Sequence, residues 1–556
     1  MLLNKAVLSL LSFVATTRAL RNGTTTNPQN ATTVPDSWPV VDLGYAKYQG
    51  RRPGTGVDEF LGMRYAKPPT GNRRFRAPED PSSELEVQDA TQYGPNCLGV
   101  AESTGKPQVP GPMNAEDCLF VNIFKPSNAT DQSKLPVWVW ITGGGFADAA
   151  WVNFNETGLV NEADQDIVFV EFNYRNGPLG FLASDQVRKD GDLNAGLLDQ
   201  RKLLHWVQMY IHKFGGDPKR VVIHGASAGA TSVAYHLTAY SGRKDNELFA
   251  GVIAQDSFWP PQRTVEEMES QYWQLLSKTN CTTLGCLRSV DIDRFQIASQ
   301  TLPFADADAD KPIPPLFYWL PVVDGTLVPD RFYNLFESGS FIHVPALIGD
   351  DTNEGSQYAP NASTAADVSV FFKNNYPNLS TIQLKEINDV YPKMDALPQH
   401  NAYFPSASAA YGDMCFTCPG NQIASSLARY NDPNLVWNYR YNVMDPETVA
   451  KGLGVHHDQE WWTIFGPVRY EAYEPASDFT INAAMIPITR HYWISFVRSL
   501  NPNTFRVPQA PEWQPWGSGA GQRIRLETNN TAMEPMPQDL TERCTFWKGL
   551  AVSTEQ

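Results

Sequence analysis

The sequence has no cluster of lysine and arginine and no hydrophobic run long enough to cross a bilayer. Its 44 basic residues are spread thinly among 60 acidic ones, which gives a formal net charge of −16 at pH 7. Nucleic-acid binding requires concentrated positive charge to neutralise phosphates, so we expect no nucleic-acid partner. The apolar stretch Ala6 to Ala15 is about half of the roughly 20 residues that a transmembrane helix needs. We therefore expect no stable membrane anchor, and the oligomeric state is left open.

The start of the chain is typical of a secretory signal peptide, which we assign to residues 1–19. Lys5 supplies the positive charge before the apolar stretch, and Thr17-Arg18-Ala19 is a small-x-small cleavage site. Residues 20–35 are rich in Thr, Asn and Pro, which predicts a flexible, glycosylated tail. The C-terminus has neither a hydrophobic tail nor a retention tetrapeptide. We expect a soluble, secreted extracellular protein.

Sequons and cysteines agree with this route. Eight N-x-S/T sequons predict glycosylation, at Asn22, Asn30, Asn128, Asn155, Asn280, Asn361, Asn378 and Asn529. Cysteine is scarce: the seven residues lie at 97, 118, 281, 286, 415, 418 and 544. An oxidising compartment favours disulfides, and the odd count leaves at least one thiol free or intermolecular. The pair Cys415 and Cys418 also fits a metal site, but zinc would need further ligands at similar spacing, so we expect no metal.

Short apolar segments bounded by turn residues predict a parallel sheet. The candidate strands are Leu135–Ile141, Ile167–Asn173, a segment from Val221, Gly251–Gln255 and Val344–Gly349. Residues 194–214 carry leucines at helical spacing and end at Gly215-Gly216-Asp217-Pro218. The alternation of strands and helices is typical of an α/β protein. Residues 263–314 and 365–424 predict helical insertions that cap one face, so we expect one domain over residues 36–556.

The segment Val221 to Ala230 predicts a strand that turns at a serine into a helix. Small residues flank Ser227 on both sides in Gly225-Ala226-Ser227-Ala228-Gly229, a G-x-S-x-G pattern. Such a turn exposes the hydroxyl and places free N–H groups of the helix beneath it. The alternative is a glycine-rich turn without chemistry, because short motifs also match by chance. Ser227 is a candidate nucleophile.

A serine nucleophile needs a histidine base that a carboxylate orients. In this kind of fold the acid and then the histidine follow the nucleophile along the chain. The loop after Val344–Gly349 contains Glu354, with Asp350 and Asp351 as rivals that charge and spacing do not separate.

Two adjacent histidines, His456 and His457, are candidates for the base. Neighbouring side chains point in different directions, so only one of them can face the serine. The alternatives are a solvated loop histidine or a metal ligand. Glu460 lies three residues after His457, but one histidine and one acid are few for a metal site.

A glycine run directly follows the strand Leu135–Ile141, in Thr142-Gly143-Gly144-Gly145-Phe146. Glycines there let the backbone approach a substrate closely, and the N–H of Ala228 supplies a donor from the serine turn. The alternative is a flexible loop tip. We interpret the run as part of an oxyanion hole.

Several further motifs, in order, make the chain resemble the type-B carboxylesterase/lipase family, the α/β-hydrolases that include cholinesterases and fungal lipases. They are Phe60 to Pro69, Arg74-Phe75, Glu116 to Asn122 and Asn194 to Gln200, and the match runs from about Gly44 to Trp547. The resemblance implies an α/β-hydrolase fold, with a mostly parallel central sheet flanked by helices and with helical cap insertions.

The resemblance also implies roles for individual residues. Ser227 would be the nucleophile, Glu354 the acid and His457 the base, with Gly144, Gly145 and Ala228 as oxyanion donors. The implied disulfides are Cys97–Cys118 and Cys281–Cys286, while a third link from Cys418 or Cys415 to Cys544 stays open. No cofactor is implied.

Three positions depart from the family pattern. Thr142 stands where a histidine usually precedes the glycine run, Gln255-Asp256-Ser257 replaces the usual Gln-Ser-Gly, and Asp458 replaces a small residue after the base. Asp256 would bring a second carboxylate near Glu354 or His457 and change the pKa of the base. We interpret these departures as signs of an unusual substrate or a shifted pH optimum.

We predict a secreted serine carboxylesterase that forms an acyl-enzyme and acts on a soluble apolar ester or a secondary metabolite. A true lipase on long-chain acylglycerols is the alternative, but only 20 residues lie between Cys97 and Cys118, too few and too polar for an amphipathic lid. A cholinesterase-like site would want an aromatic in that loop to face a quaternary ammonium, and there is none. A non-catalytic binding protein is the remaining alternative. It predicts a missing triad position, and none is missing.

Overall fold

The computed structural model describes residues 38–101, 104–150, 152–245, 247–304, 306–466, 475–517 and 521–556. The signal peptide, the tail and the sequons at Asn22 and Asn30 lie outside these residues. The contacts group Pro39–Gln556 into one compact unit, which is described here. In the described residues, no helix combines the length and the hydrophobicity that a membrane span requires.

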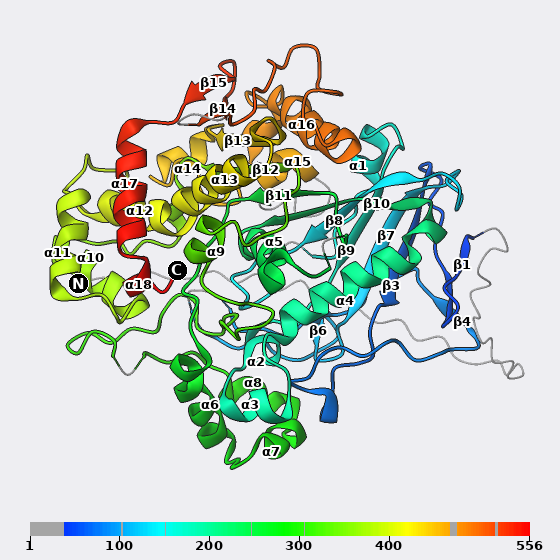
Figure 1. Cartoon of the computed structure of the whole chain (residues 1–556), viewed down its shortest axis with the longest axis horizontal. Helices are drawn as coiled ribbons and strands as arrows, with labels where there is room; N and C mark the ends of the chain where they lie inside the picture. Colours follow the sequence, from blue (N-terminus) through cyan, green and yellow to red (C-terminus); the bar gives the residue numbers. More distant parts are fainter. Residues whose placement is uncertain are drawn as a thin grey trace, which may run out of the picture. The chain divides into compact units, whose positions relative to one another are not determined.

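A ten-stranded sheet runs through this unit in the order β15-β14-β13-β12-β11-β10-β8-β9-β7-β3 (Figure 1). The strands are β3 (Val57–Arg64), β7 (Phe120–Pro126), β8 (Leu135–Ile141), β9 (Val168–Phe172), β10 (Gly216–Ala226), β11 (Gly251–Gln255), β12 (Ala346–Asp351), β13 (Val436–Tyr441), β14 (Gln522–Leu526) and β15 (Ala532–Pro535). The neighbours from β9 to β14 pair in parallel, while β3, β7 and β15 pair antiparallel. The mostly parallel sheet predicted from the sequence is confirmed.

Two smaller sheets complete the strand inventory of the described residues. One contains β1 (Val40–Asp42), β2 (Lys47–Gln49) and β4 (Val87–Asp89), and the other pairs β5 (Asn96–Cys97) with β6 (Asn114–Ala115).

Helices cover both faces of the large sheet. The helices of the described residues are α1 (Thr157–Glu162), α2 (Gly177–Phe181), α3 (Asp185–Asp190), α4 (Ala195–Tyr210), α5 (Ala228–Thr238), α6 (Val265–Thr279), α7 (Leu284–Ser289), α8 (Ile292–Ala298), α9 (Phe332–Glu337), α10 (Ala365–Asn375), α11 (Thr381–Val390), α12 (Phe404–Gly412), α13 (Cys418–Tyr430), α14 (Pro446–Ala450), α15 (Glu460–Phe465), α16 (Met485–Ser499), α17 (Gln538–Gly549) and α18 (Ala551–Thr554). Of these, α4 and α5 lie in the core on one face of the sheet, and α1, α15 and α16 lie in the core on the other. The two predicted cap regions form α6–α8 and α10–α13, and Figure 1 shows α6, α7 and α8 gathered with α3 away from the strands.

The strands are hydrophobic on both sides because both faces of the sheet are buried. In β8, Val137 and Val139 belong to the core shared with α4 and α5, while Trp138 and Trp140 belong to the core shared with α1, α15 and α16. Side chains alternate between the faces of a strand, so one apolar run supplies both cores.

The β10 strand begins earlier than the sequence predicts, at Gly216 rather than Val221. Gly215, at φ +88°, ends the preceding helical turn, and Gly216 already pairs with Leu135 of β8. The register shifts between Gly216 and Val221, which accommodates Pro218 within the strand.

Three disulfides are present in the described residues. Two of them, Cys97–Cys118 and Cys281–Cys286, are the pairs that the family resemblance implies. The third joins Cys418 to Cys544 and ties α13 to α17 across 126 residues of chain, and Cys415 is a buried free thiol.

Candidate active site

Ser227 occupies a strained turn between β10 and α5. Its φ of 57° and ψ of −124° lie outside the regions that a non-glycine residue normally adopts. The turn is possible because glycines remove side chains on either side of it: a Cβ on Gly225 would lie 2.3 Å from the backbone of Gly229, and one on Gly229 would lie 2.1 Å from the carbonyl of Ile141. Stored strain of this kind is typical of functional sites and of the nucleophile turn of α/β-hydrolases.

The glycine run after β8 lies against this turn. A Cβ on Gly143 would come within 3.0 Å of the Cβ of Ser227. Gly144 and Gly145 have positive φ, +104° and +60°, which exposes consecutive N–H groups at the loop. No backbone carbonyl of the described residues accepts a hydrogen bond from either N–H. The run therefore offers free donors beside Ser227, as an oxyanion hole requires.

Thr142 is the first residue of this loop, directly after β8. Its carbonyl accepts a hydrogen bond from the hydroxyl of Tyr174 at 2.9 Å, and its side chain is buried. The departure from the family histidine thus leaves the loop anchored through the backbone.

Glu354 and His457 form a buried pair. The Oε2 of Glu354 lies 2.6 Å from the Nδ1 of His457, and both side chains are at most 2% exposed. The Oε1 of Glu354 accepts the N–H of Asp351 at 2.7 Å, which fixes the carboxylate. A carboxylate at Nδ1 selects the tautomer in which the lone pair of Nε2 can accept a proton.

The neighbouring strand, β11, connects the backbone of Ser227 to the loop that carries His457. The N–H of Ser227 donates to the carbonyl of Gln255, the last residue of β11, at 3.0 Å. The next residue, Asp256, accepts the N–H of Asp458 at 3.1 Å, directly after His457. The carboxyl ends of β10, β11 and β12 thus bring the candidate residues to one edge of the sheet. The contact between the Oγ of Ser227 and the Nε2 of His457 stays a prediction.

The rival candidates from the sequence lie elsewhere. Asp350 is buried at the end of β12, where Thr417 donates to it at 3.3 Å, and Asp351 accepts the N–H of Gln459 at 2.7 Å. The ring of His456 lies 2.6 Å from the side-chain amide of Gln357. Among the described residues, Glu354 is the candidate acid whose carboxylate contacts a candidate imidazole, that of His457.

A group of buried carboxyls lies behind His457, and the sequence predicted one of its members, Asp256, close to Glu354 or His457. Asp256, Asp351 and Glu460 each place an oxygen within 4.8 Å of the others. Burial and mutual repulsion raise the pKa of Asp256 and Asp351 well above the usual range and that of Glu460 to about 7. The raised pKa values favour the neutral form of these carboxyl groups. Asp351 was considered only as a rival acid, and no sequence pattern distinguishes its role in holding the loop of His457.

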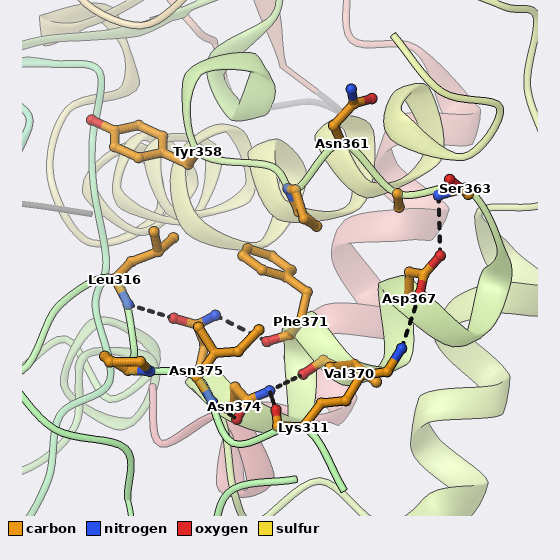
Figure 2. A pocket seen from close by; sticks show the side chains of 14 residues that line it. Lys311, Leu316, Tyr358, Asn361, Ser363, Asp367, Val370, Phe371, Asn374 and Asn375 are labelled. Carbon is orange, nitrogen blue, oxygen red and sulfur yellow. Dashed lines mark hydrogen bonds and ion pairs between the residues drawn. The ribbon is translucent and has the colours of Figure 1, made fainter. Parts of the chain in front are cut away.

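Aromatic side chains surround the imidazole of His457. Phe416 lies 4.6 Å and Tyr358 5.4 Å from it between ring centroids. Tyr358 also lines a cavity of about 510 Å³ between the segment 311–316 and α10 (Figure 2). Ile313, Leu316, Val370 and Phe371 make much of its wall apolar.

Two asparagines shape this cavity. Asn374 accepts the N–H of Ile313 at 2.9 Å, and Asn375 accepts the N–H of Leu316 at 2.8 Å. The segment 311–316 is thereby fixed to the end of α10, as Figure 2 shows for Leu316 and Asn375. The cavity has a defined wall rather than a loose loop.

The six described sequons differ in how they are held. Four asparagines are exposed and donate no side-chain hydrogen bond to another described residue: Asn128, Asn280, Asn361 and Asn529. Asn155 donates to Glu59 at 3.1 Å and Asn378 donates to Glu555 at 2.7 Å through the nitrogen that a glycan would occupy. The first four remain the better candidates for glycosylation.

Comparisons with known proteins agree with this geometry. A family profile described as the carboxylesterase family matches residues 37–547. The chain is 31% identical to "Secreted lipase 4" of Gibberella zeae, over 89% of this chain and 88% of that protein, and 31% identical to "Lipase 1" of Geotrichum candidum, over 80% and 84%. The crystal structure of Aspergillus niger EstA is similar with a TM-score of 0.89 and 55% identity, covering 93% of this chain and 99% of that one. The chain belongs to the carboxylesterase family, and it is a carboxylic ester hydrolase with the α/β-hydrolase fold.

Proposed function

We propose that the protein is a serine carboxylesterase in which Ser227, His457 and Glu354 form the catalytic triad. The observation that carries the proposal is the buried contact of 2.6 Å between Glu354 and His457, at the sheet edge where Ser227 sits in its strained turn. This combination matches the roles of acid, base and nucleophile in serine hydrolases.

The first half of the reaction acylates the serine. His457 accepts the hydroxyl proton of Ser227 at Nε2 while Oγ attacks the ester carbonyl. The N–H groups of Gly144, Gly145 and Ala228 stabilise the oxyanion. Collapse of the tetrahedral intermediate breaks the ester C–O bond, and the alcohol leaves with the proton from His457.

The second half releases the acid. A water molecule gives a proton to His457 and attacks the acyl carbon, and Oγ of Ser227 leaves with the proton returned from Nε2. Glu354 stays ionised throughout and stabilises the imidazolium that forms twice in each cycle.

We propose an ester with an apolar arm as the substrate. The aromatic rings beside His457 and the apolar wall of the 510 Å³ cavity that Tyr358 borders favour such a group. The two charged residues that also line the cavity, Lys311 and Asp367, form an ion pair with each other at 3.6 Å.

A lipase is the second candidate, because the fungal relatives carry that name. The loop closed by Cys97 and Cys118 argues against a mobile lid. Gln296 of α8 donates to the carbonyls of Gly99 and Gln108 at 3.0 and 3.1 Å, and Val100 donates to Ala147 at 2.7 Å. A loop tied at three points has little freedom to open at an oil surface.

The function is tested by the turnover of a p-nitrophenyl ester. Ser227→Ala should lower kcat by at least about a thousandfold, since the loss of a triad residue removes most of the rate enhancement. The matched control is Ser257→Ala, a buried serine at the end of the neighbouring strand, which should keep kcat within about twofold. Equal activity of wild type and Ser227→Ala would refute the proposal.

The choice between esterase and lipase is tested with one substrate at rising concentration. A triglyceride of short chains should be hydrolysed below its solubility limit with no jump when droplets form. A sharp rise of the rate at the limit would favour the lipase.

We further propose that the protein is secreted after removal of residues 1–19, with residues 20–35 as a tail and residues 36–556 as one catalytic domain. Several relatives are themselves named secreted lipases. N-terminal sequencing of protein from the culture medium should begin at Leu20, and protein retained in cells with an intact Met1 would contradict it.

A further inference from the structure

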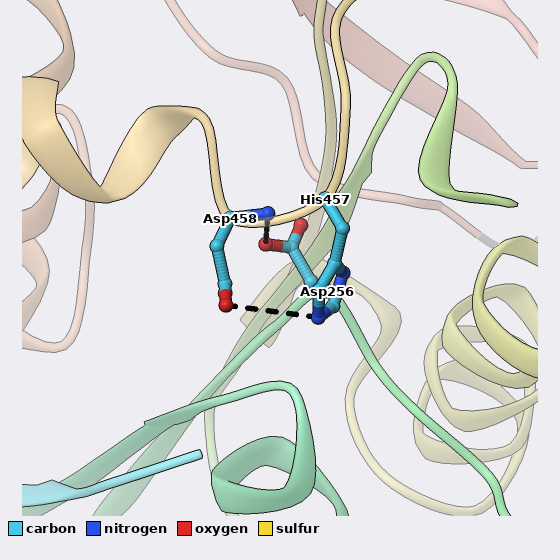
Figure 3. Close-up of side chains that lie close together, drawn as sticks. All are labelled: Asp256, His457 and Asp458. Atoms are coloured by element: carbon cyan, nitrogen blue, oxygen red, sulfur yellow. Dashed lines mark hydrogen bonds and ion pairs between the residues drawn. The ribbon is translucent and has the colours of Figure 1, made fainter. Parts of the chain in front are cut away.

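The imidazole of His457 has carboxylates near both ring nitrogens. Glu354 lies 2.6 Å from Nδ1, and the Oδ2 of Asp458 lies 3.7 Å from Nε2 (Figure 3). Nε2 is the atom that takes the proton in the proposed reaction. Asp458 therefore stands where positive charge appears during catalysis.

Asp458 holds this place through a special backbone conformation. Its φ is +63°, a left-handed value that only glycine, asparagine and aspartate adopt readily. Its N–H donates to the Oδ2 of Asp256 at 3.1 Å, as Figure 3 shows. Without that acceptor the N–H would be left without its partner next to the base.

Asp256 is itself fixed by the sheet. It follows β11 directly, its N–H donates to the carbonyl of Gly349 in β12 at 2.9 Å, and its side chain is fully buried. The next peptide of the loop is held in the same way, because Asp351 at the end of β12 accepts the N–H of Gln459 at 2.7 Å. Two buried carboxyls at strand ends thus accept the backbone N–H groups of the two residues that follow His457.

The further titratable groups that face this arrangement come from several elements. They are Glu354, Asp350, Asp351, Glu460, Tyr439, Tyr358 and His456. Arg523 of β14 and Arg440 of β13 oppose the rise in the pKa of Asp350 through their positive charges. The surroundings of His457 are therefore mainly acidic.

We propose that Asp458 is a second carboxylate for the imidazolium of His457, and that Asp256 is the positioning residue that holds it there through the Asp458 backbone. The proposal rests on the proposed function, in which His457 is the base. Neither residue is part of the triad, and both are departures from the family pattern.

The two residues act in different ways. Burial and four neighbouring carboxyls raise the pKa of Asp256 well above its usual range, so it accepts the Asp458 N–H as a neutral group and adds no charge. Asp458 is partly open to solvent, with 16% of its side chain exposed, and it supplies the negative charge. A negative charge near Nε2 favours the imidazolium, so it moves the acid limb of kcat/KM to higher pH.

The test is the pH profile of kcat/KM between pH 4 and 9 on a soluble p-nitrophenyl ester. Asp458→Asn keeps the left-handed conformation and removes the charge, so the midpoint of the acid limb should fall by about one pH unit. Asp432→Asn removes one exposed charge, four residues before β13 begins, and should leave the midpoint unchanged. An unmoved midpoint in Asp458→Asn overturns the role of Asp458.

Asp256 is tested by two substitutions and a double variant. Asp256→Asn keeps an acceptor for the Asp458 N–H and should preserve the midpoint, while Asp256→Ser is too short to reach it and should lower the midpoint as Asp458→Asn does. The double variant Asp256→Ser/Asp458→Asn should match Asp458→Asn alone, because both act on the same charge. Additive shifts, or an equal shift in Asp256→Asn, overturn the positioning role. Near-UV circular dichroism identifies any variant that fails to fold, and if Asp256→Ser does not fold, Asp256→Ala, which also lacks the acceptor, replaces it.

Failure of the proposed function gives a different result. His457→Gln should abolish turnover if His457 is the base. If that variant stays active, the triad is wrong. If it is inactive while Asp458→Asn keeps the wild-type midpoint, the triad stands and the second carboxylate does not.

Discussion

Glu354 joins the sheet to His457 with one carboxylate. Its Oε1 accepts the backbone N–H of Asp351 at 2.7 Å, at the end of β12, while its Oε2 lies 2.6 Å from Nδ1 of the imidazole. The strand end therefore fixes the carboxylate, and the carboxylate fixes the ring. The orientation of His457 depends on both contacts.

Glu354→Gln should break this link with little change in packing. The amide keeps the shape of the side chain but favours the wrong imidazole tautomer, so kcat should fall by about 10³–10⁴ with a small change in KM. Steady-state kinetics and a thermal melt check the prediction. The control is Glu267→Gln, in the capping box of α6, which should affect the melt more than kcat. A loss below tenfold for Glu354→Gln would contradict the assigned role.

The oxyanion loop predicts a second loss of activity. A Cβ on Gly144 would lie 2.4 Å from the carbonyl oxygen of Asp148, and the backbone there has φ +104°. Gly144→Ala should therefore displace the loop and lower kcat by about 10²–10³, the typical cost of one oxyanion donor. Gly158→Ala is the control, since nothing lies within 4 Å of its added methyl group. Similar kcat values for the two variants would argue against the donor role of this loop.

The disulfides predict an order of stabilities. The Cys418–Cys544 link closes a loop of 126 residues, whereas Cys281–Cys286 closes one of 5. In the chain-entropy account the longer loop contributes more, about 5 kcal/mol against about 2 kcal/mol. Double Cys→Ala variants and urea denaturation measure both. The reverse order would show that native contacts, rather than loop closure, dominate.

The buried carboxyls predict how the free energy of unfolding varies with pH. Burial raises the pKa of Asp350 from 3.8 to about 7, so its stabilising effect is complete below about pH 4 and is lost as the pH rises to 7. The opposite case is Glu534, where Arg440 and Arg523 lower the pKa from 4.5 to about 2, so stability is lost as the pH falls from 4.5 towards 2. The two effects together place the maximum of the free energy of unfolding near pH 4–5.

Asp350→Asn should make the free energy of unfolding vary less with pH between pH 4 and 7. The amide still accepts the hydrogen bond of Thr417 but has no proton to lose, and the change amounts to at most about 4 kcal/mol across that window. Urea denaturation at pH 4.5 and 7.5 measures it. An equal pH dependence in wild type and variant would show that other carboxyls carry the effect.

Much of the fold could be predicted from the sequence. The strand Leu135–Ile141 and the strand Gly251–Gln255 have the predicted bounds, because short apolar runs between turn residues have few alternatives in a buried sheet. The candidate Ser227 came from a local motif, whereas the choice of Glu354 and His457 over their neighbours came from the family resemblance.

The rest depends on contacts between distant parts of the chain. Residue spacing did not separate Glu354 from Asp350 and Asp351, and only the fold shows that Glu354 meets His457, 103 residues further on. The sequence marked Asp256 and Asp458 as departures from the family pattern, but only the fold shows that Asp256 accepts the N–H of Asp458 across 202 residues. The early start of β10 at Gly216 was missed because Pro218 usually ends a strand, and a register shift accommodates it here.

The central claim is that Ser227 is the nucleophile that His457 activates. Its most direct test is reaction of the purified protein with a p-nitrophenyl phosphonate ester, followed by intact mass and peptide mapping. The account predicts one adduct per chain, on the peptide that contains Ser227, with labelling at least about a hundredfold slower in His457→Gln. An adduct on another residue, or equal labelling rates in both proteins, would contradict it.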